Sequence, residues 1–119
     1  MTVEADLFTA LKGLVSNHVY RDIAPADVTA LPRITFQQVG GTSVNFVDQT
    51  APSKRNCRMQ VNVWDATRDT ANALARAVED ALRAASALQT TVLGEFVAVY
   101  EEETRLYGTQ QDFSFWSAS

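Results

Sequence analysis

Histidine is the side chain that most often moves protons at neutral pH, and this chain has one, His18. Acid–base catalysis also needs a nucleophile or substrate and an orienting acid close to the imidazole, and the residues around His18 supply neither. His18 follows a predicted helix, where its ring could instead interact with the last helical carbonyl groups. The second interpretation fits the local sequence better.

The densest run of charge is formed by Glu101, Glu102 and Glu103. Consecutive side chains on a strand point to opposite faces, so the three carboxylates cannot all bind one metal ion. Two interpretations stay open. The run is either a solvated strand end or an electrostatic contribution to an interface or a pore.

Other residue types that carry chemistry are isolated. Cys57 is the only cysteine, so no disulfide can form within the chain, and it falls on the apolar side of a predicted strand. Gly40 and Gly41 lack the spacing of a phosphate-binding loop, and no serine lies in a nucleophile-elbow motif. Histidine, cysteine and carboxylate side chains do not cluster at metal-ligand spacing. We therefore expect no catalytic residues, no metal, no cofactor and no enzymatic activity.

Length and charge narrow the function classes further. The 119 residues suffice for a single domain (residues 1–119), and 46% hydrophobic residues are ordinary for a globular protein. A net charge of -4 argues against a nucleic-acid-binding module, although DNA could slide past such a surface without sticking. Apolar runs are too short to span a membrane, and the acidic residues 1–6 are unlike a secretory signal. We expect synthesis in the cytosol and no membrane partner.

The clearest structural pattern joins a strand to a helix within residues 56–88. Apolar side chains alternate along the strand, at Cys57, Met59, Val61 and Val63. The helix then repeats apolar residues at intervals of three and four, as follows: Ala71, Leu74, Ala75, Val78, Ala81, Leu82 and Ala85. Alanine on the buried stripe lets a helix lie close to a sheet, so the two elements form one packed unit.

The remaining elements complete a two-layer fold. A helix capped by Thr2 should run over residues 2–16 and bury Leu7, Leu11, Leu14 and Val15. Strands are predicted over residues 33–39, 42–48, 92–103 and 110–116, with a bulge or turn at Gly40-Gly41 and a turn at residues 106–108. The order is α-β-β-β-α-β-β. It predicts an α+β two-layer sandwich, with two helices on one face of a mostly antiparallel sheet of four to five strands.

Several residues are candidates for an interface. Trp64 and Trp116 lie opposite the apolar stripes of their strands, where they are either shielded by a loop or placed in a subunit contact. The arm, residues 41–55, holds apolar side chains with no core to enter, and is either a surface hairpin or a contact with a neighbour. The full set of predicted interface residues is Phe46, Val47, Asp48, Arg55, Arg58, Trp64 and Trp116.

The order of several motifs resembles a known family. VYRDIAPADVTALPRITFQQVGG lies at residues 19–41, and a strand ending in Val63-Trp64 follows. An Ala/Arg-rich helix begins at Asp65-Ala66-Thr67, and YEEETRLYGTQQDFSFW closes the chain at residues 100–116. In this order they resemble the small tail-completion, or tail-terminator, proteins of long-tailed bacteriophages and prophages. The resemblance covers nearly the whole chain.

The resemblance implies a structural, head-to-tail joining protein. Such a protein assembles as a homo-oligomeric ring, a hexamer, on the head-proximal end of the tail tube, either by itself or only once the tube is present. The ring ends tube polymerisation and gives the head a docking surface. The implied partners are the tail-tube protein and a head-completion or connector protein, and DNA passes through without specific binding. The implied location is the virion, after assembly in the host cytoplasm.

Two other classes compete with this interpretation. A small-molecule- or protein-binding α+β module without catalysis would need a well-formed pocket, and the alanine-rich helix argues against one. A hydrolase or nuclease accessory enzyme would need clustered acids and a metal.

Overall fold

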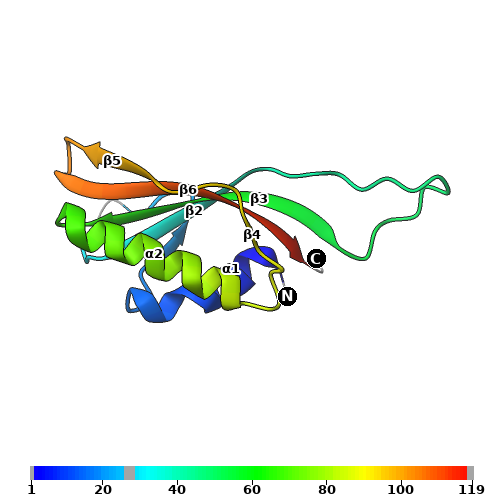
Figure 1. The fold of residues 1–119 in the computed structure, drawn as a ribbon, viewed down its shortest axis with the longest axis horizontal. Helices are drawn as coiled ribbons and strands as arrows, with labels where there is room; N and C mark the ends of the chain where they lie inside the picture. Colours follow the sequence, from blue (N-terminus) through cyan, green and yellow to red (C-terminus); the bar gives the residue numbers. More distant parts are fainter. Residues whose placement is uncertain (1, 26–28, 118–119) are drawn as a thin grey trace.

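The computed structural model describes residues 2–25 and 29–117. Over these residues the chain forms one open sheet of six strands, with two α-helices beneath it (Figure 1). The predicted α+β two-layer arrangement is therefore confirmed. The elements in chain order are α1 (Val3–Leu11), a 3-10 turn (Lys12–Leu14), β1 (Val19–Arg21), β2 (Arg33–Gly40), β3 (Arg55–Asp65), α2 (Arg68–Ala84), β4 (Thr91–Val92), β5 (Val97–Glu101) and β6 (Leu106–Ser117).

The strand order is β1-β2-β3-β6-β4, and β5 also pairs with β6. Within the described residues β1 and β2 are the one parallel pair, so the sheet is mostly antiparallel as expected. It has six strands where four to five were predicted, because two strands are gained and the one predicted over residues 42–48 is lost. The short segment β1 joins the edge of the sheet, and the strand predicted over residues 92–103 is divided into β4 and β5.

Helix α2 and the two central strands form the core. The Thr67 hydroxyl caps the helix by accepting the backbone N–H of Thr70 at 3.2 Å. Leu74, Val78 and Leu82 then lie in one buried cluster with the inward residues of β3 and β6, namely Met59, Val61, Val63, Phe113 and Phe115. The predicted packing of the helix stripe on the apolar side of the strand is confirmed. None of the described helices is both long enough and apolar enough to cross a membrane.

The N-terminal helix is shorter than predicted. Thr2 caps it, with the backbone N–H of Ala5 donating to the Thr2 hydroxyl at 3.1 Å, but α1 ends at Leu11. Gly13 lies in the 3-10 turn that follows, where glycine is a poor helix former. The tighter turn rotates Leu14 outward, leaving it 37% exposed, whereas Leu7, Leu11 and Val15 are buried as expected.

Residues 42–48 do not form the predicted strand. The irregularity predicted at Gly40-Gly41 lies one residue earlier, because the β2–β3 register shifts between Gln38 and Gly40. Both glycines have positive φ, 138° and 154°, and a side chain on Gly41 would collide with the carbonyl of Asn56. The chain therefore leaves the sheet here instead of continuing the ladder, and β1 supplies the third strand before α2.

The end of the chain turns earlier than predicted. β5 and β6 form a hairpin in which Glu101 pairs with Leu106, so the turn covers residues 102–105 and not 106–108. Arg105, at φ 57°, takes the left-handed conformation that this turn needs. Gly108 lies within β6 because the Trp64 ring packs over it, and a Cβ there would approach that ring to 2.6 Å.

Candidate interface: the arm and the open face of the sheet

The arm extends beyond the body of the molecule (Figure 1). Its residues between β2 and β3 belong to no strand. The described molecule measures 52 × 27 × 24 Å, and the arm forms one end of the long axis. Asn56 fixes the base. Its Oδ1 accepts the backbone N–H of Thr42 at 2.7 Å, and its Nδ2 donates to the Ser114 hydroxyl at 2.8 Å and to the Phe115 carbonyl at 3.1 Å. The start of the arm is thereby tied to the centre of the sheet.

The tip of the arm is an ordered turn. The backbone N–H of Gln49 donates to the Phe46 carbonyl at 3.0 Å, and Gln49 has a left-handed φ of 64°. The Asp48 carboxylate accepts the backbone N–H of Thr50 at 3.1 Å and its hydroxyl at 2.9 Å. These hydrogen bonds, the backbone one first, lower the pKa of the Asp48 carboxyl group. The tip therefore presents a fixed negative charge.

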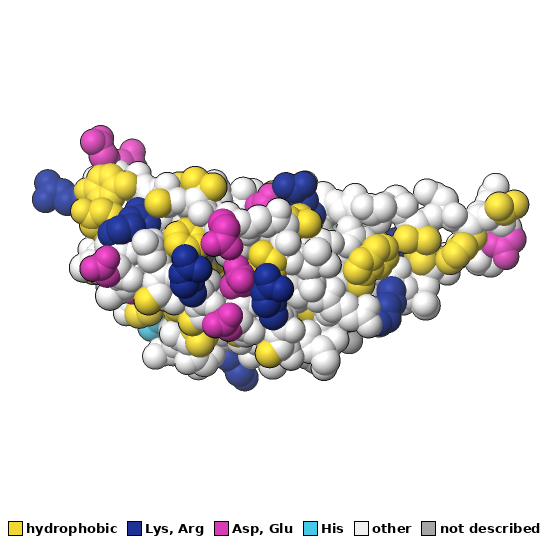
Figure 2. Space-filling view, viewed as in Figure 1, with side chains coloured by type: hydrophobic (Ala, Val, Ile, Leu, Met, Phe, Trp, Pro, Cys, Tyr) yellow, Lys and Arg dark blue, Asp and Glu magenta, His cyan; other side chains and the backbone are white. Residues whose placement is uncertain are grey.

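Two apolar side chains of this turn lie in solvent. Phe46 is 49% exposed and Val47 is fully exposed. In Figure 2 apolar surface continues along the arm and reappears at its tip, far from the core. Apolar side chains held outward on an ordered turn are typical of a surface that docks on another molecule. Contact with a neighbouring subunit stays a prediction.

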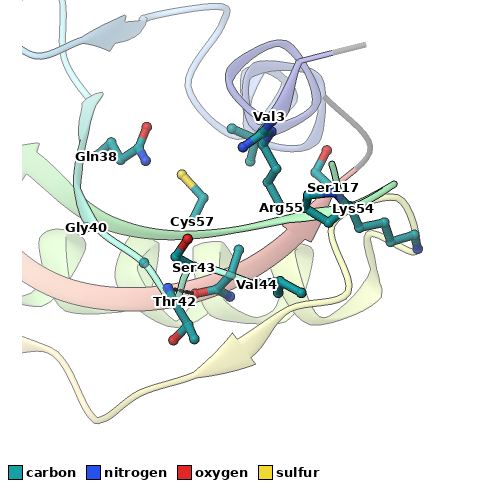
Figure 3. Close-up of a pocket in the computed structure, with 13 residues that line it drawn as sticks. Val3, Gln38, Gly40, Thr42, Ser43, Val44, Lys54, Arg55, Cys57 and Ser117 are labelled. Atoms are coloured by element: carbon teal, nitrogen blue, oxygen red, sulfur yellow. Dashed lines mark hydrogen bonds between the residues drawn. The ribbon is translucent and has the colours of Figure 1, made fainter. Parts of the chain in front are cut away.

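A groove lies at the base of the arm, where the arm, α1 and the end of the sheet meet (Figure 3). We call it the basal groove; its volume is about 470 Å³, and its lining residues include Val3, Gly41, Val44, Pro52, Lys54, Arg55 and Cys57. Lys54 and Arg55 are exposed, and within the described residues neither has an ion-pair partner. Burial, and then the charge of Glu4, raise the pKa of the Cys57 thiol, so it stays protonated in the floor.

Arg58 was predicted to act with the arm, but it points elsewhere. Its Nη2 and Nε lie 2.6 and 3.1 Å from Asp112 Oδ2, across the face of the sheet that the helices leave uncovered. We call this surface the open face. Its residues alternate with the buried ones along β3 and β6, and most are polar: Gln60, Asn62, Gln110, Asp112 and Ser114. The Arg58–Asp112 pair neutralises charge on the open face.

Trp64 and Trp116 lie on the open face as predicted, but at opposite ends of it. Trp116 pairs with Asn56 and Trp64 with Gly108, eight positions apart, which corresponds to about 27 Å along a strand. Trp64 lies in a groove of about 800 Å³ between the chain that follows β1 and the β5–β6 hairpin. Thr35 lines the same groove and is only 6% exposed. Trp64 is therefore partly shielded by neighbouring chain, and the two indoles do not form one patch; a subunit contact at either indole stays a prediction.

The catalytic candidates are not brought together. His18 precedes β1, and its backbone N–H, not its ring, donates to the Val15 carbonyl at 3.0 Å. Its Nδ1 is buried without a partner among the described residues, so the predicted interaction of the ring with helical carbonyls is not seen. Glu102 and Glu103 lie in the β5–β6 turn and not on a strand, and only Glu101 ends β5. Among the described residues no three potential ligands could hold a metal ion.

One residue that positions the hairpin gave no signal in the sequence. Arg68, at the start of α2, donates from Nη1 to the Gly108 carbonyl at 2.8 Å and from Nη2 to the Val99 carbonyl at 2.7 Å. Its guanidinium also lies 5.3 Å from the centre of the Tyr107 ring. An arginine in the first turn of a helix has no pattern that predicts this contact, because both acceptors are backbone groups 31 and 40 residues away.

Comparison with known proteins decides the family. The model of the family described as tail completion protein gp17 matches residues 5–118, which is almost the entire chain. The chain belongs to this family. The resemblance predicted from the motif order is therefore confirmed, and the family identifies this tail completion protein as a structural component of phage tails.

A solved structure supports the fold independently. A chain in the structure titled "Virion of native gene transfer agent (GTA) particle" superposes with a TM-score of 0.62 at 19% sequence identity. The alignment covers 98% of this chain and 95% of that one, so the two share the fold from end to end. No curated protein sequence gave a significant match.

Proposed function

We propose that this tail completion protein forms a hexameric ring on the head-proximal end of the tail tube. The ring ends tube polymerisation, since its outer face differs from the tube subunit, and gives the filled head a docking surface. Family membership over residues 5–118 is the observation that carries the proposal. The whole chain acts as one tail-terminator domain and does so without catalysis or cofactor.

In this proposal the arm makes the contact between neighbours. Phe46 and Val47 are ordered and exposed on its tip, and Asn56 anchors its base to the sheet. An interface residue that is already held in place loses less conformational entropy on binding than a disordered one. Arg55 contributes to the same subunit contact from the basal groove. Trp64 and Trp116 contribute to it separately, from the two ends of the open face.

The partners follow from this location. The ring meets the tail-tube protein on one side and a head-completion or connector protein on the other, and it joins the virion in the host cytoplasm. DNA passes through without specific binding, which suits a chain of net charge -4 whose open-face arginine, Arg58, is paired with Asp112.

The test is removal of the arm in the phage. Residues 42–54 are replaced by two glycines, which can close the gap because the arm leaves and returns beside Asn56. We expect overlong tails or unjoined heads and tails by electron microscopy, from a protein that still unfolds cooperatively.

A finer variant, F46S with V47S, should give the same defect without shortening the chain. The matched control is L14S, which removes a partly exposed apolar side chain (37%) from the helical layer and should assemble normally. Tails of normal length that join heads, in the absence of the arm, would show that the arm makes no essential contact.

A further inference from the structure

Two separate regions of the molecule carry opposite, unpaired charge. Lys54 and Arg55 lie at the basal groove, and Glu102 and Glu103 lie in the β5–β6 turn. All four are exposed, and within the described residues none takes part in an ion pair. In Figures 1 and 2 the turn, with acidic side chains, lies at the end of the long axis opposite the arm. The basic pair and the acidic pair therefore cannot meet within one molecule.

The basal groove suits a protein segment better than a nucleic acid. It offers two cations, whereas phosphate backbones are usually held by an extended basic surface. Its other contributions include the apolar side chains of Val3, Val44 and Pro52, and none of its described lining residues is acidic. An apolar floor with charge at the rim is typical of protein interfaces.

The β5–β6 hairpin has the complementary features. Its turn, which we call the acidic hairpin (residues 101–105), holds three glutamates and one arginine, and the Thr104 hydroxyl donates to Glu101 at 2.8 Å, which leaves the other two carboxylates free. Behind it, Val97 and Tyr100 on β5 are 60% and 49% exposed. Within the described residues β5 pairs only with β6, so its outer backbone groups are available as well.

We propose that the basal groove of one subunit accepts the acidic hairpin of the next subunit around the ring. Lys54 and Arg55 face Glu102 and Glu103, and β5 then runs beside the arm, with its exposed apolar residues toward Phe46 and Val47. The contact joins two different surfaces of the same chain, and such a heterologous contact closes into a ring when the rotation between subunits is right. This contact rests on the proposed ring and names its interface.

Charge reversal at each surface tests the contact. The groove variant is K54E with R55E, and the hairpin variant is E102K with E103K. Each is supplied to a phage that lacks its own copy of the gene, and the infectious titre is measured. The control, K12E with R76E, changes the net charge as much as the groove variant does, at exposed residues of the helical layer. All variants are first checked for folding by thermal unfolding.

We expect each reversal alone to lower the titre by at least about tenfold, because like charges then face each other. The control should keep the wild-type titre. Two combinations should restore infectivity: all four changes in one chain, and co-expression of the groove and hairpin variants, which can alternate around an even-numbered ring. If one reversal does not fold, the neutral changes K54Q, R55Q, E102Q and E103Q replace it, with a smaller loss expected.

Full infectivity of either single reversal would overturn the contact. So would losses that neither combination restores, since the charges would then serve another partner, such as DNA or the tube protein. Whether the protein forms a ring is tested separately, by locating the wild-type protein in the particle. If that ring is seen while the reversals are harmless, only the groove–hairpin contact is wrong.

Discussion

At the scale of single residues, Leu82 and Leu14 show how position decides what a leucine contributes. Leu82 is fully buried between α2 and the sheet, and Leu14 is 37% exposed after α1. Truncation of a buried leucine loses its transfer free energy and leaves a cavity. We expect L82A to lower the free energy of unfolding by about 2–5 kcal/mol, measured by urea denaturation. L14A should cost clearly less, and equal losses would contradict the assigned core.

Asp48 and Thr50 permit a test of the arm tip that is independent of assembly. The two hydrogen bonds from Thr50 lower the pKa of the Asp48 carboxyl group, so T50V, which removes the hydroxyl donor, should raise it toward the ordinary value. Because the pKa is depressed in the folded state, the turn gains stability above the ordinary pKa and loses it as the pH falls through the lowered one. A carboxyl titration by NMR measures both effects. An unchanged pKa in T50V would mean that the turn does not form in solution.

At the scale of elements, one glycine is required for packing within the sheet, whereas another lies in a loop with open space around it. A methyl group on Gly108 would meet the Trp64 ring, whereas nothing lies within 4 Å of a Cβ at Gly94. G108A should destabilise the fold by about 1–3 kcal/mol, as overpacking does, and should shift the tryptophan fluorescence. G94A is the matched control and should leave both unchanged. A G108A protein as stable as the wild type would show that Trp64 does not close over β6.

The elements also show what hydrophobic pattern can and cannot predict. The alternation in β3 and the stripe of α2 predicted the core, because both periods follow directly from backbone geometry. The pattern did not predict that β1 joins the sheet, because its three residues pair with a strand that begins 12 positions after β1 ends. The hydrophobic pattern also predicted the last turn at residues 106–108, whereas Gly108 lies within β6. In the sequence, a glycine that leaves room for an indole ring cannot be distinguished from a glycine in a turn.

At the scale of the whole molecule, the candidate site was only partly predictable. The arm with Phe46 and Val47 followed from apolar residues that had no core to enter, and the structure places them on an exposed tip. The pairing of Arg58 with Asp112 was not predicted, since Asp112 lies 54 residues away on a neighbouring strand, and a subunit contact at Arg58 stays a prediction. The basal groove was missed entirely, because it forms only where α1, the arm and the end of β6 meet.

The proposed function requires the protein to form a terminal ring on the tail tube. The most direct measurement is a reconstruction of the head–tail junction of wild-type particles by electron cryomicroscopy. We expect one layer of this chain, closed into a hexamer, between the last ring of the tail tube and the head connector, with each arm against a neighbouring subunit. Finding the protein at the distal tip, or repeated in successive layers along the tube, would contradict it.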